Sequence, residues 1–158
     1  MRKFDREITN FDEIAALVES CDTMRIAFND EKAPYIVPLS FGYETKDGQF
    51  IFYVHGARQG RRHELAAKSS YVGVELDVCN GFVELESGDQ TADYRSFIGT
   101  GEISTVTGDE AVHALELLCR HCGFKTMHCT QTVVNNTCVE KITVSDFAAK
   151  QRFKKASR

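Results

Sequence analysis

Several residue types and patterns that mark particular protein classes are scarce or missing in this chain. Its 158 residues include 2 prolines, no tryptophan and 6 cysteines. Cysteines this sparse do not build the disulfide framework of a small secreted domain, so we expect reduced thiols. No apolar run is longer than residues 50–54. Because a membrane-spanning helix needs about 20 apolar residues, we expect no membrane partner.

Basic residues are fewer than acidic ones, with 19 Lys and Arg against 23 Asp and Glu, so the net charge is −4 at pH 7. Nucleic acids bind basic surfaces, so we expect no nucleic-acid partner. Residues 1–7 lead into no apolar segment of the kind that forms a secretory signal, which favours a cytoplasmic location. With 42% apolar and 27% charged residues, the chain is expected to form a single domain over residues 1–158.

Three segments are predicted to be helical, and in the first and the third apolar residues recur at the spacing of an amphipathic helix. The first and third begin with pairs typical of a capping box, Asn10 with Glu13 and Thr107 with Glu110. Residues 124–136 have no clear period. The predicted helices cover residues 10–20, 60–68 and 107–122.

Strand patterns fill most of the remaining chain. Asp47-Gly48 and Asn80-Gly81 each predict a tight hairpin, because these dipeptides suit the positive φ angles of a two-residue turn. Hairpins join antiparallel strands, which disfavours parallel doubly wound folds. We therefore expect a mainly β protein, a small antiparallel barrel with two or three flanking helices. The predicted strands cover residues 24–28, 35–43, 49–55, 71–78, 82–86, 94–106 and 138–144.

The strongest chemical pattern lies between the third predicted strand and the second predicted helix. The strand ends at His55, Gly56 follows, and Arg58, Arg61 and Arg62 cluster where the helix begins. A helix N-terminus offers free backbone N–H groups, and arginine adds forked donors that match phosphate geometry. The cluster therefore suits a phosphate group. A solvated helix start with three surface charges explains the same pattern, and both interpretations stay open.

Two predicted strands have faces with little side-chain bulk. Pro38, in the segment 34–42, has no backbone N–H and marks a sheet edge, a bulge or an interruption that would leave backbone groups free for a planar heterocycle. Gly99 and Gly101, in the segment 94–101, fall on one face and leave room for a ring or another backbone. A bulge and a tight barrel corner explain the two patterns without any ligand.

Cysteine and histidine are dense near the end of the chain, where Cys119-x-x-Cys122 precedes His128 and Cys129. The first two cysteines lie one turn apart on a predicted helix, whereas structural zinc sites usually hold such pairs in a turn. Cys138 has no partner at a useful spacing. We therefore expect no bound metal. No catalytic triad and no glycine-rich dinucleotide motif can be recognised, so the sequence assigns no catalytic residue.

Taken together and in this order, the segments resemble those of pyridoxamine-phosphate-oxidase-like flavoproteins, in the branch that includes nitroimidazole-resistance reductases. The similarity covers roughly residues 1–118. It rests on the lead Met1–Ile8, on Pro34-Tyr35-x-Val37-Pro38-Leu39-x-Phe41-Gly42, on His55-Gly56-Ala57-x-x-Gly60-Arg61-Arg62, and on Tyr94-Arg95-Ser96-x-Ile98-x-x-Gly101.

The resemblance implies a split β-barrel homodimer that holds FMN at the subunit interface, with His55 contacting the cofactor rather than acting as a general base. Two positions depart from the common pattern, since Ser40 stands where relatives often have asparagine and Arg62 where they often have lysine. Both residues keep hydrogen-bonding capacity or charge. The residues expected at the FMN site are Val37, Pro38, Leu39, Ser40, His55, Gly56, Arg61, Arg62 and Ser96.

Two functions follow from this resemblance. In the first, the protein is an FMN-dependent oxidoreductase that passes electrons from NADH or NADPH to a small planar acceptor, such as a nitroimidazole or another nitroaromatic. In the second, it has no catalytic activity and stores or senses FMN, or binds another planar ligand such as haem. The sequence leaves both functions open, and the chemistry of the first would be carried by the cofactor.

Overall fold

The computed structural model describes residues 4–128 and 130–153. A short 3₁₀ helix covers Phe4–Arg6. The strands are β1 (Glu7–Ile8), β2 (Met24–Phe28), β3 (Tyr35–Leu39), β4 (Gly42–Lys46), β5 (Gln49–Ala57), β6 (Tyr71–Glu84), β7 (Gln90–Val106) and β8 (Thr137–Gln151). The helices are α1 (Phe11–Glu19), α2 (Arg61–Lys68), α3 (Gly108–His121) and α4 (Gln131–Asn136).

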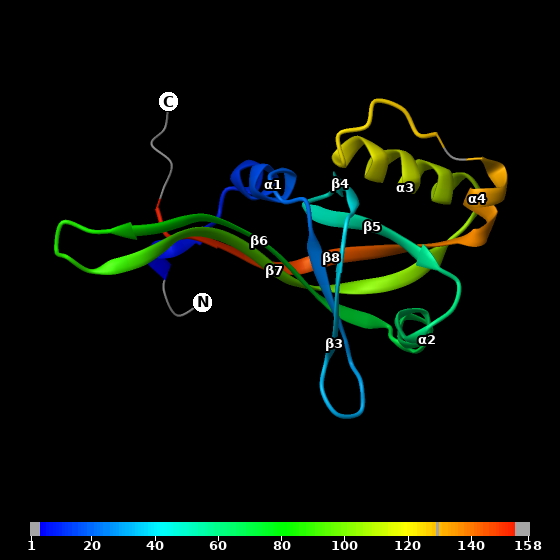
Figure 1. Cartoon of the computed structure of the whole chain (residues 1–158), viewed down its shortest axis with the longest axis horizontal. Helices are drawn as coiled ribbons and strands as arrows, with labels where there is room; N and C mark the ends of the chain where they lie inside the picture. The colour runs from blue at the N-terminus through cyan, green and yellow to red at the C-terminus, as the bar shows by residue number, and fades with distance from the viewer. Residues whose placement is uncertain (1–3, 129, 154–158) are drawn as a thin grey trace.

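The strands form an 8-stranded antiparallel sheet in the order β3-β2-β6-β7-β8-β5-β4, with β1 added beside β8. β3 and β4 are consecutive in the chain but lie at opposite ends of this order, so the sheet curls without closing. The predicted mainly β split barrel is confirmed. In Figure 1, α1 and α3 lie above the sheet, α2 lies below it, and the β6–β7 hairpin extends far to the left.

Aromatic residues fill the interior of the barrel. Phe50, Phe52 and Val54 alternate along β5 and have no exposed surface. The ring of Phe50 lies 5.3 Å from that of Phe97 on β7 and 5.0 Å from that of Phe11 on α1, measured between centroids. Because burying one such side chain stabilises the fold by about 1.5–3 kcal/mol, these contacts fix α1 against the sheet.

The opposite face of β5 is also covered, because α3 packs on it. Tyr53 of β5, Val139 of β8 and Leu117 of α3 belong to a second buried cluster. With both faces of β5 buried, its sequence is continuously apolar rather than alternating. The helix approaches β4 at Gly42, where an added Cβ would lie 2.6 Å from the carbonyl carbon of Leu117.

The hairpin predicted at Asn80-Gly81 is wrong. β6 continues through this dipeptide to Glu84, and the pairing of β6 with β7 shifts between Cys79 and Gly81 as in a β-bulge. Gly81 has a φ of 123°, so the bulge uses the positive φ that a tight turn would also require. The real turn lies at residues 85–89, where the N–H of Leu85 donates to the carbonyl of Asp89 at 2.8 Å.

Three other predictions need correction. The strand predicted over residues 35–43 is interrupted at residues 40–41, where the chain passes from one end of the sheet to the other. α4 is an additional helix, and Thr130 caps it by accepting a hydrogen bond from the N–H of Val133 at 3.4 Å. Thr107 precedes α3, but its side chain makes no capping hydrogen bond.

Among the described residues, no helix has the length and apolar character needed to cross a membrane.

We predict that Gly42→Ala destabilises the protein by about 1–3 kcal/mol, because the new methyl group would push against the backbone of α3. Gly73→Ala is the matched control, since a Cβ there would make an ordinary 3.5 Å contact with the Cβ of Ala27. The control is expected to leave stability unchanged or to raise it by up to about 1 kcal/mol. Urea unfolding measures both variants, and equal stabilities would contradict the close packing of α3 on β4.

Candidate functional site

The predicted site begins at the turn between β5 and α2. Gly60, with a φ of 98°, is the N-cap of α2 and supplies no side-chain hydrogen bond to the helix. The first backbone N–H groups of α2 are therefore left without the side-chain acceptor that usually caps a helix. Together with the positive end of the helix dipole, they make this N-terminus suitable for an anion.

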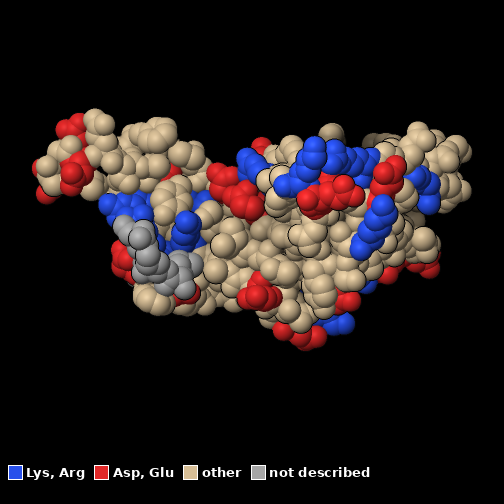
Figure 2. Space-filling view, turned by 90° about the horizontal axis from the view of Figure 1, so that it is seen from below, with Lys and Arg blue, Asp and Glu red and all other residues tan. Residues whose placement is uncertain are grey.

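The arginines of the predicted cluster diverge and bind different partners. Arg58 donates from Nε to the carbonyl oxygen of Asn135 at 3.1 Å. Arg61 forms an exposed ion pair with Asp30, in the loop between β2 and β3, and so connects α2 to that loop. Viewed from the side that carries α2 and this loop, Lys and Arg side chains gather in a band with acidic side chains beside it (Figure 2). A phosphate at α2 would have to compete with such carboxylates.

Arg61 also reaches the first residue of β3. Its guanidinium carbon lies 5.1 Å from the ring centroid of Tyr35, within the range of a cation–π interaction. Hydrogen bonds to the carboxylate of Asp30, first from the N–H of Glu31 and then from Arg61, lower the pKa of Asp30. The structure therefore brings the start of α2 and the start of β3 together, as the predicted site requires.

Arg62 turns away from solvent and forms an ion pair with Glu140 of β8. The side chains of Arg62 and Glu140 are 12% and 1% exposed, so this is a buried pair. The guanidinium occupies the space beside Gly56, where an added Cβ would lie 3.0 Å from its Cζ. Because breaking a buried pair costs about 3–5 kcal/mol, Arg62 holds α2 on the barrel, and its contact with FMN stays a prediction.

His55 is exposed on β5, beside the turn that Gly56 begins. Desolvation by the surrounding protein, and to a smaller extent the positive charge of Arg62, lower the pKa of His55. The imidazole is therefore neutral at pH 7, so it offers one donor and one acceptor to a bound molecule without adding charge.

β3 forms an open edge of the sheet. Among the described residues, it pairs only with β2, so its other side leaves backbone groups free. Pro38 and Ser40 are exposed, while Val37 and Leu39 are half-buried and pack on the barrel core. Of the four residues predicted to lie along a planar ring, Val37, Pro38 and Leu39 thus belong to an accessible edge strand, and Ser40 directly follows it.

Ser96 is not brought to this edge within one chain. It lies in β7, opposite Asp77 of β6 and Lys150 of β8. β2 and β6 separate β7 from β3, and strands are spaced by about 4.8 Å, so Ser96 is roughly 14 Å from Pro38 across the sheet. One copy of the chain therefore does not place Ser96 beside Pro38.

The glycine face of β7 lies against side chains of β8, which favours the barrel corner over a ligand as the explanation of this pattern. A Cβ at Gly99 or at Gly101 would lie 2.7 Å or 2.8 Å from a methyl group of Val144. These glycines let β7 and β8 pack closely at a corner of the barrel.

In the segment rich in cysteine and histidine, His121 turns inward, with Nε2 2.7 Å from the carbonyl oxygen of Cys21. Cys129 lies outside the described residues.

Glu140 is the residue of this region that the sequence analysis missed. It alternates with Ile142 and Val144, both fully buried, so a charged residue stands at an inward position of β8. Such a position predicts a buried ionic partner. This signal could have been found in the sequence, although the identity of the partner could not.

A comparison with protein-family models supports the resemblance seen in the motifs. The model for pyridoxamine 5'-phosphate oxidase matches residues 10–151. The chain belongs to the pyridoxamine 5'-phosphate oxidase family. The match extends beyond residue 118, where the motif similarity ended, and includes the whole of β8 and therefore Glu140.

Solved structures share the fold of this family member. A 5-nitroimidazole antibiotic resistance protein from Bacteroides thetaiotaomicron is 22% identical, with a TM-score of 0.81 over 91% of this chain and 85% of that one. The flavocytochrome Anf3 from Azotobacter vinelandii is 17% identical, with a TM-score of 0.75 over 98% and 72%. A protein from Mycobacterium smegmatis described as binding FAD and haem is 14% identical, with a TM-score of 0.76 over 97% and 76%. None of the curated proteins compared matches the chain.

Proposed function

We propose that this protein binds FMN and transfers electrons from NADH or NADPH to a small planar acceptor, with nitroimidazoles and other nitroaromatics as the candidate class. The observation that carries the proposal is the N-terminus of α2, which lacks a side-chain cap and stands beside the open edge of β3. We assign the activity to the cytoplasm, where thiols are kept reduced.

The residues present fit the two ends of FMN. The free N–H groups at the start of α2 and the exposed guanidinium of Arg61 suit the terminal phosphate. The exposed Pro38 on the unpaired edge of β3, and the exposed Ser40 just after this strand, suit the planar ring. The solved relatives described as a flavocytochrome and as FAD- and haem-binding proteins support a flavin or a haem in this fold.

The proposed reaction rests on positioning rather than on acid–base catalysis. When bound, flavin accepts a hydride from reduced nicotinamide and passes electrons to the acceptor. The protein would hold the two planar molecules in contact, and His55 would offer hydrogen bonds from a neutral ring. The main alternative, a protein that stores or senses a flavin or haem, requires the same binding site but no access for nicotinamide.

The separation of Ser96 from β3 supports a homodimer as the functional unit. If Ser96 contacts the flavin ring beside β3 as predicted, a second copy is its proposed source, because β2 and β6 stand between the two positions in one chain. Each flavin would then lie between α2 and β3 of one copy and β7 of the other.

Our first binding prediction concerns the phosphate. We expect FMN to bind more tightly than riboflavin, and Arg61→Gln to weaken FMN about tenfold, because a charge-assisted hydrogen bond contributes about 1.5–3 kcal/mol. Riboflavin, which has no phosphate, should bind the variant as it binds the parent. Arg120→Gln removes a charge from the exposed end of α3 and serves as the control.

Quenching of flavin fluorescence measures these affinities, with FAD titrated in parallel. Equal affinities of the parent for FMN and riboflavin would contradict a phosphate site at α2. Tighter binding of FAD than of FMN would replace FMN by FAD as the cofactor.

The dimer prediction is tested by mixing two defective subunits. We expect Ser96→Trp to block flavin binding by bulk and Arg61→Gln to weaken it, while a heterodimer of the two regains one tight site. This result follows because one of its two sites would combine the unchanged Arg61 of one copy with the unchanged Ser96 of the other. If both residues served a flavin from the same chain, no tight site would return. Light scattering of the flavin-loaded parent should give twice the mass of one chain.

Electron transfer is tested by anaerobic stopped-flow spectroscopy. We expect NADH or NADPH to bleach the absorbance of bound FMN, and a nitroimidazole to restore it. If dithionite bleaches the flavin while neither nicotinamide does, the protein is not a nicotinamide-dependent reductase and the binding function is the correct one.

A further inference from the structure

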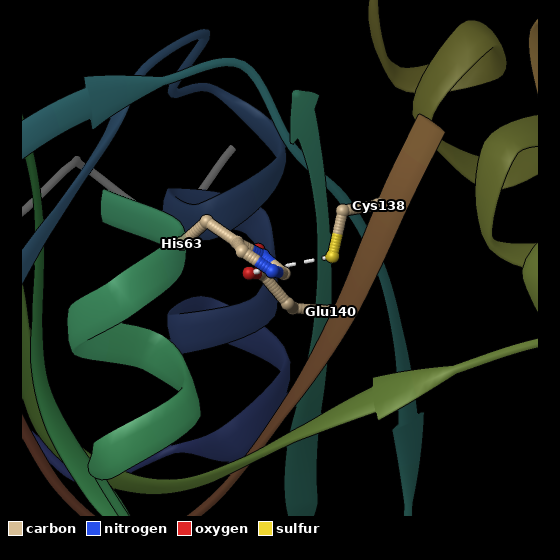
Figure 3. Close-up of side chains that lie close together, drawn as sticks. All are labelled: His63, Cys138 and Glu140. Carbon is tan, nitrogen blue, oxygen red and sulfur yellow. Dashed lines mark hydrogen bonds between the residues drawn. The ribbon is translucent and has the colours of Figure 1, made fainter. Parts of the chain in front are cut away.

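Between α2 and β8, three side chains that commonly bind metals converge at one end of the barrel (Figure 3). They are His63 of α2 with Cys138 and Glu140 of β8, and one ligand atom from each lies within 4.8 Å of the other two. Figure 3 shows His63 reaching down from the helix towards the two strand residues. The register of the sheet explains the arrangement, because Cys138 lies opposite Gly56, beside which the guanidinium of Arg62 from α2 lies.

We propose that His63, Cys138 and Glu140 bind a divalent transition-metal ion, with Zn²⁺ as the ion of best chemical fit. Imidazole, thiolate and carboxylate are the three ligand types that protein zinc sites use. With bonds of about 2.0–2.3 Å, a tetrahedral ion needs ligand atoms about 3.3–3.8 Å apart. Sγ of Cys138 already lies 3.8 Å from Oε1 of Glu140, and the ligand atoms of all three residues lie within 4.8 Å of one another.

Burial distinguishes this group from a chance gathering of surface side chains. Cys138 and Glu140 are each 1% exposed, and His63 is half-buried. The three ligands would leave a fourth position for water or an anion, as in zinc sites that are not purely structural.

Arg62 completes the arrangement as an outer partner of the carboxylate. It binds Oε2 of Glu140, while Oε1 faces Cys138, so one oxygen remains for the ion. Ligating carboxylates are commonly oriented in this way by a second hydrogen-bonding group. In the bound state, the charges of a thiolate and a carboxylate would balance the ion, and Arg62 would keep its positive charge.

Binding includes a proton transfer. Burial and the charge of Glu140 raise the pKa of Cys138, so the thiol is protonated in the metal-free protein. Coordination replaces this proton, forming an S–Zn bond and releasing one H⁺ to solvent. No oxidant or reductant takes part.

The sequence predicted a protein without bound metal, and the proposal differs from that prediction at these three residues. The prediction rested on the Cys119-x-x-Cys122 segment and on the lack of a partner for Cys138 at a useful spacing in the sequence. The partners are found in three dimensions, because Glu140 lies two residues further along the same strand and His63 comes from a distant helix. The proposal does not depend on flavin binding.

Cobalt substitution tests the site without any activity assay. Flavin-free, chelator-treated full chain is titrated with Co²⁺ under reducing conditions. We expect one Co²⁺ per chain, a sulfur-to-cobalt charge-transfer band, the d–d bands of a four-coordinate ion, and loss of all these bands when Zn²⁺ is added. Folded protein that gives no charge-transfer band would overturn the proposal.

Variants locate the ion. Cys138→Ser should abolish the charge-transfer band, and His63→Asn should weaken Co²⁺ affinity at least tenfold. Cys122→Ser, which changes an exposed cysteine outside the group, should leave the spectrum intact. Since Glu140→Gln would leave Arg62 buried without its partner, the conclusion rests on the other two variants, with circular dichroism to confirm folding. A band that survives Cys138→Ser, or one that is lost with Cys122→Ser, would place the metal elsewhere and refute this site.

Discussion

A buried ion pair between Arg62 and Glu140 fixes the geometry of this protein where the candidate sites lie. Removing two charges from water is costly, so the pair persists only with a defined geometry around it. That geometry includes Gly56, which leaves space for the guanidinium, and it includes the first turn of α2. By holding this turn on the barrel, the ion pair also positions the free N–H groups of the helix, the exposed Arg61 and the inward-pointing His63.

The open barrel gives the same region its accessibility. β3 and β4 are joined by two residues but lie at opposite ends of the sheet, so the edge of β3 stays unpaired beside the start of α2. An unpaired strand edge usually favours aggregation, because its free N–H and C=O groups can pair with a strand of another chain. Here it is the surface against which a flat ring is proposed to lie, and Arg61 ties it to α2 through Asp30 and Tyr35.

The two proposed sites use opposite sides of α2. Arg61 points to the loop before β3, whereas Arg62 and His63 point into the end of the barrel. In these proposals, neighbouring residues on one helical turn would bind an anion on the outer side of the helix and a cation on its inner side.

Much of the fold could be predicted from local patterns. Asp47-Gly48 specifies its hairpin, Asn10 caps α1 by accepting a hydrogen bond from the N–H of Glu13, and the apolar alternation of β2 and β6 matches their burial. Asn80-Gly81 misled the prediction because a bulge and a tight turn need the same positive φ, and only the pairing of β6 with β7 distinguishes them. The motifs likewise indicated the cofactor residues as a set, but not which of them one chain brings together.

The sequence by itself determined the mainly β class, the family resemblance and the arginine-rich helix start, because each depends on neighbouring residues and their spacing. The tertiary structure decided the partners of those arginines, the filling of the Gly99 and Gly101 face, and the meeting of His63 with Cys138 and Glu140. These contacts join segments far apart in the chain. They are set by strand register and barrel curvature, since a shift of one residue along β8 would turn Glu140 away from the barrel interior.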